Sequence, residues 1–130
     1  MKFPPWLKVY GDTAYRGKCA SEKVEQIAFF SAIRRRPDGL LFLHPRNEGK
    51  RTPQQAALQT AEGMVKGTAD IITPFGFVCE MKRRDHTQSK WEIDQLTWLS
   101  MAYESSCFVC VALGAAAALE AVKDFDLQRE

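Results

Sequence analysis

The segment from Gly67 to Lys82, GTADIITPFGFVCEMK, constrains the fold more than any other part of the chain. Two runs rich in β-branched and aromatic residues, Ala69–Thr73 and Phe75–Met81, meet at the turn signal Pro74-Phe75-Gly76. Short apolar runs joined in this way are typical of a β-hairpin. The sequence therefore predicts two adjacent strands here, and the sheet has to be built around them.

The other elements follow from apolar spacing and from helix-capping residues. Ser21 is a good N-cap, and Thr52 followed by Pro53 is a typical helix start. We expect an irregular lead-in over residues 1–20, helices over 22–36, 53–63, 90–105 and 115–125, and further strands at Leu40–Leu43 and Phe108–Leu113. The order α-β-α-β-β-α-β-α predicts an α/β or α+β fold, a mixed sheet flanked by helices, in a single domain over residues 1–130.

Composition and charge exclude several classes of protein. Hydrophobic residues make up 45% and charged residues 26% of the 130 residues, which is ordinary for a globular chain. No apolar run approaches the ~20 residues of a membrane span, and two prolines stand where a signal peptide needs an apolar stretch. We therefore expect a cytoplasmic protein. Its formal net charge is only +2, and its basic clusters, Arg34–Arg36, Lys50-Arg51 and Lys82–Arg84, suit either a polyanion or solvated surface.

Four cysteines raise the question of a zinc site. Cys107 and Cys110 form a C-x-x-C, but they lie in the strand-like run SSCFVCVAL. Residues three apart on a strand point to opposite faces, so this pair is poorly placed to chelate one ion. We expect buried free thiols, as in a reducing compartment, for Cys19, Cys79, Cys107 and Cys110.

Three charged residues of the hairpin carry the chemistry. Glu80 and Lys82 are two apart and project to one face of their strand. Hairpin pairing brings Asp70 alongside the same end. Two carboxylates with open coordination positions suit Mg²⁺, and an ammonium beside them can stabilise a developing negative charge. The backbone C=O of Met81 is a plausible additional ligand. The alternative is a surface salt bridge, since Glu-x-Lys on one strand face is common.

The ordered set of motifs resembles the VRR-NUC branch of the PD-(D/E)XK nuclease superfamily, in its stand-alone, phage-type form. The resemblance covers about residues 21–113. It rests on SEKVEQIAFF in the first helix, the loop HPRNEGKR, the hairpin G-T-A-D…E-M-K, and S-K-W…Q-L-T-W-L after it. It implies a restriction-endonuclease-like fold and Mg²⁺-dependent DNA cleavage, with Mn²⁺ as a substitute.

The resemblance also implies roles for individual residues. Asp70 and Glu80 would be metal ligands, Lys82 the catalytic lysine, and Gln95 a partner of the lysine that holds the attacking water or a phosphate. A glutamate of the first helix would complete the site. Glu22 fits the E-x-x-x-Q spacing to Gln26 better than Glu25 does, although both share one helical face. Gln95 could instead be an exposed helix residue.

Two departures from the family pattern stand out. Ala69 replaces the usual proline before the first aspartate, and the loop carries an added acid, Glu48. Around the hairpin we expect polar and basic loop residues to contact the DNA backbone, which gives affinity but no sequence specificity. These residues are Arg46, Asn47, Lys50, Arg51, Lys66, Arg83, Arg84 and His86. His86 could alternatively be a general base or a bystander.

The function expected from these observations is structure-selective cutting of branched DNA. Stand-alone members of the family resemble Holliday junction resolvases, which need two active sites and hence a homodimer. Trp6, Phe29, Phe30 or Trp98 could supply the interface. The alternatives are a flap or non-specific endonuclease, and a non-catalytic DNA-binding or inhibitor protein on a nuclease-derived fold. A bacterial or phage-infected cell is the expected setting, by resemblance only.

Overall fold

The structure is a computed structural model that describes residues 3–45 and 51–130. A four-stranded mixed sheet forms its centre. The strand order is β1-β4-β3-β2. β4 is parallel to both β1 and β3, and β2 pairs antiparallel with β3 as the edge strand. The strands are β1 (Lys8–Tyr10), β2 (Ile71–Ile72), β3 (Phe77–Lys82) and β4 (Phe108–Leu113).

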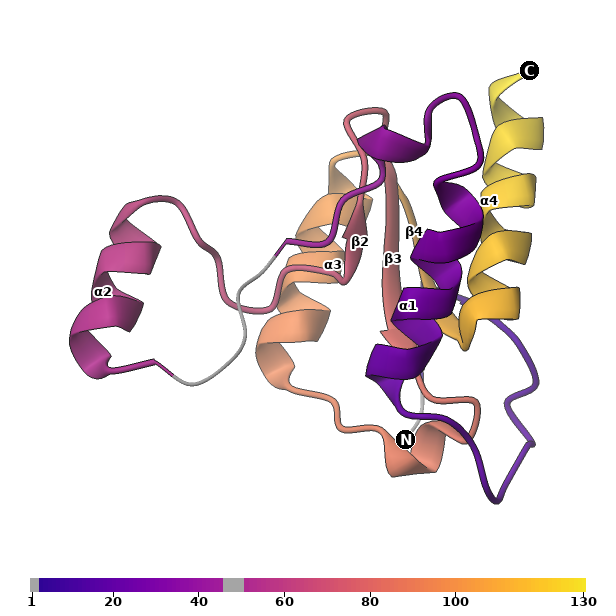
Figure 1. The fold of residues 1–130 in the computed structure, drawn as a ribbon, viewed down its shortest axis with the longest axis horizontal. Helices are drawn as coiled ribbons and strands as arrows, with labels where there is room; N and C mark the ends of the chain where they lie inside the picture. The colour runs from indigo at the N-terminus through magenta and orange to yellow at the C-terminus, as the bar shows by residue number, and fades with distance from the viewer. Residues whose placement is uncertain (1–2, 46–50) are drawn as a thin grey trace.

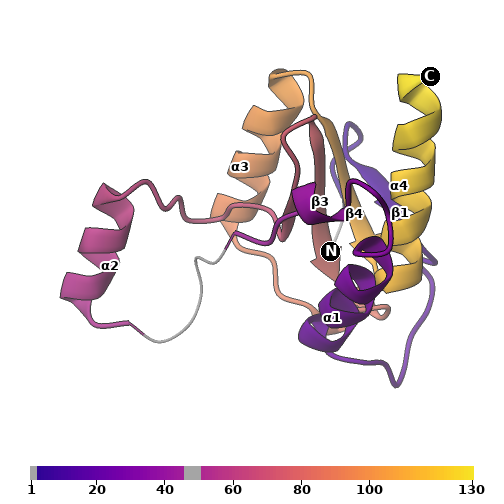
Figure 2. The same cartoon turned by 45° about the horizontal axis from the view of Figure 1, so that its top comes forward.

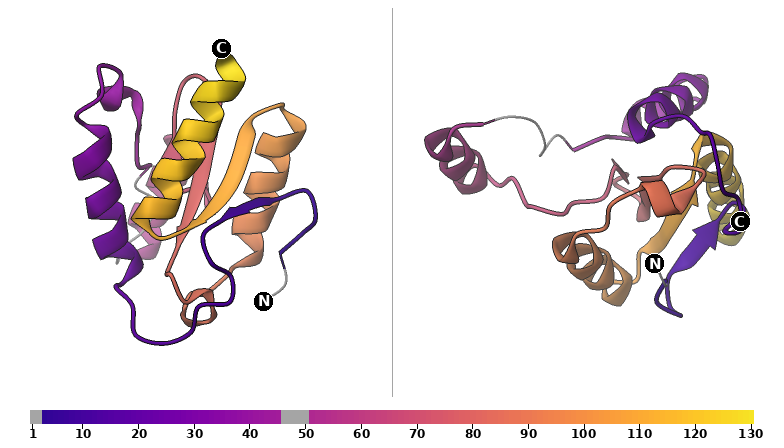
Figure 3. Two further views of the ribbon diagram at one scale, coloured as in Figure 1. Left: turned by 90° about the vertical axis from the view of Figure 1, so that its right-hand side faces the viewer. Right: turned by 90° about the horizontal axis from the view of Figure 1, so that it is seen from below.

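Helices cover both faces of this sheet (Figure 1). α1 (Glu22–Ile33) and α4 (Ala115–Arg129) pack together on one face, and α3 (Ile93–Glu104) packs on the other, as the view from below in Figure 3 shows. α2 (Pro53–Ala61) stands apart from the sheet beyond its β2 edge (Figure 2), and none of its residues is buried. The expected α/β class, a mixed sheet flanked by helices, is confirmed.

The two capping predictions are confirmed by hydrogen bonds. The Ser21 hydroxyl accepts from the N–H of Val24 at the start of α1. Thr52 and Gln55 form a reciprocal capping box at the start of α2, with Pro53 in the first turn. Each cap satisfies backbone N–H groups that have no partner inside the helix.

Alternation along β3 decides what faces each helix layer. All six residues of β3 are buried. Cys79 and Met81 join the apolar core beneath α1 and α4, whereas Val78 belongs to the core beneath α3. Because strand side chains alternate, Glu80 and Lys82 lie on the α3 side with Val78.

The run Leu40–Leu43 is not the buried strand that its apolar character predicts. Residues 39–41 form a 3-10 turn, in which Leu40 is 79% exposed, while Phe42 is fully buried. The Arg34 guanidinium stabilises this turn by donating hydrogen bonds to the carbonyls of Gly39 and Phe42. A side chain at Gly39 would overlap the Ile33 carbonyl at the end of α1. Among residues 40–43, only Leu43 forms a backbone bridge to the sheet, and its partner is Ile72.

The lead-in is also more ordered than predicted. Residues 8–10 form β1, whose parallel pairing with β4 cannot be read from three residues of local sequence. Other boundaries shift: α1 ends at Ile33, the hairpin strands are shorter, α3 begins only at Ile93, and α4 continues to Arg129. The observed order of helices and strands is therefore β-α-α-β-β-α-β-α.

The cysteines match the prediction in part. All four are free thiols, but only Cys79 and Cys110 are buried, facing each other across β3 and β4. Cys107 precedes β4 and is half-buried, as is Cys19. A hydrogen bond with Cys110, together with burial, raises the pKa of the Cys79 thiol. Within the described residues, no helix has the length and apolar character needed to cross a membrane.

The contrast between Leu40 and Phe42 predicts a sharp difference in stability. We expect Phe42→Ala to lower the free energy of unfolding by about 3–5 kcal/mol, because it leaves a cavity among Phe29, Phe75 and Phe77. Leu40→Ala should change it by less than about 0.5 kcal/mol. Urea denaturation followed by circular dichroism measures both. Equal losses would mean that residues 40–43 form a buried strand after all.

Candidate functional site

Asp70 and Glu80 meet across the hairpin, where the ladder between β2 and β3 ends. The backbone N–H of Asp70 donates to Glu80 Oε1 over 3.2 Å. In return, Asp70 Oδ2 accepts from the N–H of Met81 over 2.8 Å. Glu80 is 1% exposed and Asp70 is half-buried. The structure thus brings together the two carboxylates that the sequence singled out.

Glu80 occupies an environment that disfavours its ionised form. Burial is the largest cause, followed by the negative charge of Asp70, and together they raise the pKa of Glu80 well above its ordinary value. The charge of Lys82 acts in the opposite direction on this pKa, so the ammonium lies within electrostatic reach. Two adjacent carboxylates of this kind are stabilised in their charged form by a cation.

Lys82 is as deeply buried as Glu80, with 1% of its surface exposed. Its Nζ donates to the Lys90 carbonyl oxygen over 2.7 Å and to Gln95 Oε1 over 3.2 Å. The Trp91 ring lies over the ammonium, 4.2 Å from Nζ to the ring centroid. A carbonyl, an amide and an aromatic face therefore replace the water that a buried ammonium loses.

Gln95 serves two partners at the start of α3. Its Oε1 accepts from Lys82 and also from the N–H of Glu92, the N-cap residue, over 3.1 Å. The capping box of α3 thereby orients the amide that holds the lysine. The alternative of an exposed Gln95 does not fit this position. Sequence reasoning missed Lys90 and Trp91 as partners of the lysine; the fragment S-K-W just before the helix was the available signal.

The backbone of Met81 faces Asp70. The neighbouring carbonyl of Lys82 accepts from Gly114 N–H on the β4 side. Successive residues of a strand turn their N–H and C=O groups to alternate edges, so those of Met81 point to the β2 side. The bond from Met81 N–H to Asp70 agrees with this direction. The Met81 carbonyl therefore lies on the same edge of β3 as the Asp70 carboxylate.

The acids of the first helix approach from the other side of the sheet. α1 packs with α4 on the face opposite α3. Glu25 accepts a hydrogen bond from the N–H of Ala115, at the start of α4, over 3.2 Å. Glu22 is half-buried one turn earlier. Across residues 3–45 and 51–130, no group of three or more His, Cys, Asp or Glu side chains is placed to hold a metal ion, so Glu22 does not join Asp70 and Glu80 here.

The predicted DNA-binding residues divide into several environments. Lys66 and Arg84 are exposed: Lys66 pairs with Asp94 over 3.3 Å, and Arg84 lies over the Tyr15 ring. Arg51 is exposed and donates to Gln59 and Met64. Arg83 is half-buried and donates to the carbonyls of Cys19 and Ala20. Arg46, Asn47 and Lys50 lie outside the described residues.

His86 is placed differently from the expectation for a phosphate contact. It is 5% exposed, its Nε2 lies 3.2 Å from the Thr13 carbonyl oxygen, and its ring packs on Phe3. A ring enclosed in this way reaches neither a phosphate nor the carboxylates in this conformation. Its position supports the bystander alternative, that of a packing residue.

Asp85 joins the segment after β3 to the N-terminal lead-in. Its carboxylate accepts from the Thr87 hydroxyl and N–H, from Gly17 N–H over 2.9 Å and from the Gln88 amide over 3.0 Å. Arg83 N–H bonds to the Ser89 hydroxyl over 2.8 Å in the same segment. These bonds hold residues 83–90, which lead directly to the Lys90 carbonyl and Trp91 above the lysine.

Comparison with solved structures finds a likeness in fold. A solved structure described as a VRR_NUC domain protein superimposes with a TM-score of 0.62 and 18% sequence identity, over 85% of this chain and 89% of that one. The chain has a VRR_NUC-like fold. No family model and no curated protein matches the sequence.

An identity of 18% shows a shared fold and assigns no role to any residue. Within this VRR_NUC-like fold, the chemistry has to be judged from the side chains themselves. Two carboxylate groups and a backbone carbonyl on one edge of β3 form an all-oxygen donor set, which fits Mg²⁺ better than a soft metal. Of the proposed dimer contacts, Phe29 is fully buried inside the fold and cannot supply an interface, whereas Trp6, Phe30 and Trp98 are half-buried.

The carboxylate of Asp85 predicts a pH-dependent contribution to stability. Hydrogen bonds from the Thr87 hydroxyl and Gly17 N–H hold the pKa of Asp85 well below its usual range. A depressed carboxyl pKa contributes stability above the unfolded value of about 3.9, which is lost as the pH falls towards the folded pKa. We expect Asp85→Asn to melt earlier than wild type near neutral pH, with a gap that narrows below about pH 4. Thermal melts across this range, with exposed Glu104→Gln as the control, measure the gap; a constant gap would contradict the prediction.

Proposed function

We propose that this chain is a Mg²⁺-dependent DNA endonuclease that hydrolyses phosphodiester bonds. The observation that supports it is the pair of hydrogen bonds that hold Asp70 beside Glu80, with Lys82 on the same face of β3. Asp70 N–H donates to Glu80, and Met81 N–H donates to the Asp70 carboxylate. A structural salt bridge would leave Glu80 paired with the lysine. Instead, Lys82 donates to Lys90 and Gln95, and the two carboxylates face each other.

In this proposal Asp70, Glu80 and the Met81 carbonyl would hold Mg²⁺, with Mn²⁺ as a substitute. Mg²⁺ needs few protein ligands and keeps positions for water and phosphate oxygens. When bound, it would acidify a water molecule and neutralise charge on the scissile phosphate. Glu22, or Glu25 in its place, is the proposed further ligand from α1, reaching the carboxyl end of β3 from the opposite face of the sheet.

Lys82 and Gln95 are the proposed partners of the reacting phosphate and water. An ammonium has three N–H groups, and two are used on Lys90 and Gln95. The third would donate to the attacking water or to a phosphate oxygen as negative charge develops. Gln95 would keep the ammonium in place through its Oε1 and offer its amide N–H groups to the same ligands.

The proposed substrate is branched DNA, cut by a homodimer as in a Holliday junction resolvase. Exposed Lys66 and Arg84, with Arg51, would contact phosphates around the hairpin, and Arg46, Asn47 and Lys50 are proposed to do the same. Arg83 would act by tying the segment that carries Arg84 to the carbonyls of Cys19 and Ala20. A flap or non-specific endonuclease shares the same chemistry and differs only in the DNA structure that it prefers.

Cleavage assays test the proposal directly. We expect wild-type protein with Mg²⁺ or Mn²⁺ to cut at least one of a panel of junction, flap, single-strand and linear substrates. Lys82→Met keeps the apolar stem and should lower the cleavage rate by at least about a hundredfold, because one charge-stabilising donor is lost. Binding in the presence of EDTA should be retained.

Lys123→Met, an exposed change on α4, is the matched control and should cut as wild type does. Protein that binds junctions but never cuts with either metal would support the non-catalytic DNA-binding alternative. Mass measurement in solution tests the homodimer separately.

Metal binding is measurable without any DNA. We expect Mg²⁺ or Mn²⁺ to raise the melting temperature of the wild type. At a hundredfold excess over Kd, binding should add about 2.7 kcal/mol to the free energy of unfolding. Asp70→Asn and Glu80→Gln should each abolish this gain, because each removes a charged ligand, while Glu104→Gln should retain it. An unchanged wild-type melting temperature with both metals would refute the metal site.

A further inference from the structure

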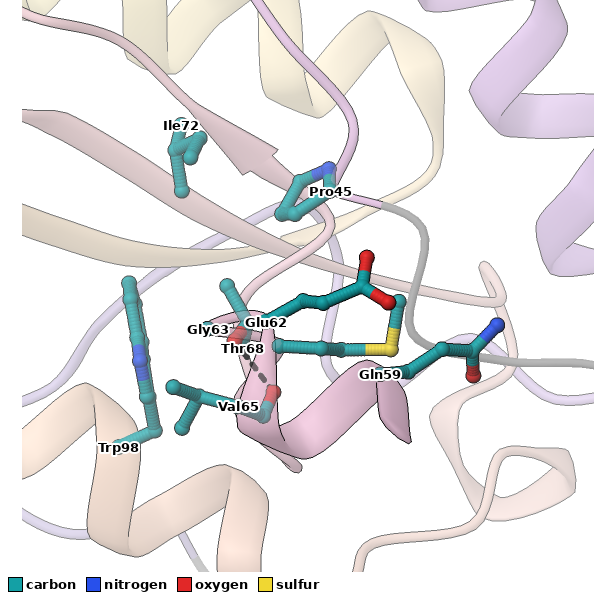
Figure 4. Close-up of a pocket in the computed structure, with 9 residues that line it drawn as sticks. Pro45, Gln59, Glu62, Gly63, Val65, Thr68, Ile72 and Trp98 are labelled. Atoms are coloured by element: carbon teal, nitrogen blue, oxygen red, sulfur yellow. Dashed lines mark hydrogen bonds between the residues drawn. The ribbon is translucent and has the colours of Figure 1, made fainter. Parts of the chain in front are cut away.

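A pocket of about 500 Å³ opens beside the edge strand β2, between α3 and the segment that follows α2 (Figure 4). Trp98 forms one side: its indole is seen edge-on in Figure 4, with its flat face towards the other lining residues. Those residues are mostly apolar near the indole and polar further away: Pro45, Val65, Thr68 and Ile72, then Gln59 and Glu62.

Both walls of the pocket continue from the candidate site. Along the chain, Asp70 stands between two lining residues, Thr68 and Ile72. On α3, Trp98 lies three residues after Gln95, the partner of Lys82, so the two occupy neighbouring positions on one helical face. A strand whose phosphate reaches Asp70 and Glu80 would therefore have its adjoining nucleotide at the pocket.

The wall opposite Trp98 is anchored to α3. Gly67 has a φ of +86° and approaches α3 so closely that a side chain there would overlap the Asp94 carbonyl. Lys66 pairs with Asp94 over 3.3 Å, and the Thr68 hydroxyl donates to the Val65 carbonyl over 2.6 Å. The turn that carries Val65 and Thr68 is thus held beside the indole.

The chemistry of the lining favours a planar, uncharged heterocycle over a phosphate. Among the described residues, no basic side chain lines the pocket, and Glu62 would repel an anion. Arg51 lies behind the lining and donates to Gln59 and Met64. The indole face offers a stacking platform. The Gln59 side chain accepts from Arg51 and the Thr68 hydroxyl donates to Val65, so the groups offered to the edge of a base are the Gln59 amide N–H groups, the Glu62 carboxylate and the Thr68 oxygen. A base that is still paired and stacked in a duplex cannot enter such a pocket, whereas an unpaired one can.

We propose that this pocket receives an unpaired nucleobase next to the scissile phosphate, with Trp98 as the stacking residue. The inference rests on the proposed nuclease function, because it takes DNA as the substrate. Such a pocket would direct cutting to branch points, frayed ends or single strands, where unpaired bases occur.

Binding measurements without catalysis test the pocket. The probe is a short fluorescein-labelled single-stranded oligonucleotide, with a labelled duplex for comparison, followed by fluorescence anisotropy in EDTA. Loss of one stacked base should weaken single-strand binding of Trp98→Ala by about 5-fold to 150-fold and leave duplex binding within about twofold. Trp98→Tyr keeps an aromatic face and should retain most of the affinity.

The control variant is Met101→Ala, one turn further along α3, where the side chain is 56% exposed and outside the pocket. It should bind both probes as wild type does. A second measurement needs no variant: wild-type protein should bind the single strand less tightly when its bases are replaced by abasic sites.

The outcomes separate this inference from the proposed function. If Trp98→Ala or abasic substitution leaves single-strand binding unchanged, the pocket is not a base site, even where the wild type cuts DNA. If Trp98→Ala weakens duplex and single strand equally, the inference is also overturned. A selective loss for the single strand supports it, and cleavage by wild type with Mg²⁺ or Mn²⁺ then decides the nuclease proposal independently.

Discussion

Two hydrogen bonds between Asp70 and β3 set the geometry on which the candidate site depends. β2 has only two residues, so strand pairing ends before it reaches Asp70. The bonds from Met81 N–H to the Asp70 carboxylate and from Asp70 N–H to Glu80 continue the connection beyond the ladder. They hold two acids side by side at the edge of the sheet, where backbone pairing alone would leave Asp70 free to turn away.

The buried charges around this contact are compensated unequally. Lys82 has a carbonyl, an amide oxygen and an indole face around its ammonium. Glu80 accepts a backbone N–H but also faces the Asp70 charge, and burial raises its pKa. Burying a charge without compensation is costly, so the surroundings of Glu80 disfavour its ionised form beside Asp70, whereas the ammonium of Lys82 has partners. This imbalance is the physical reason to expect a cation beside the acids.

Much of the fold was predictable because its signals are local. The caps at Ser21 and Thr52, the hairpin turn and the strand Phe108–Leu113 each depend on residues close together in sequence, and all are present in the structure. The run Leu40–Leu43 and the strand β1 were missed for the opposite reason. Arg34 and the end of α1 fold residues 39–41 into a turn, and β1 exists only through its pairing with β4.

By itself, the sequence determined that Asp70, Glu80 and Lys82 share one end of a hairpin, since strand alternation and turn position follow from residue spacing alone. It could not determine which helix layer they face, or what surrounds the lysine. Only the tertiary structure decided that Lys90 and Trp91, just before α3, and Gln95 in its first turn surround Lys82. It also decided that His86 is enclosed and that α1, with Glu22 and Glu25, packs beside α4 on the opposite face of the sheet. Those relations depend on how distant segments pack, and local sequence does not encode packing directions.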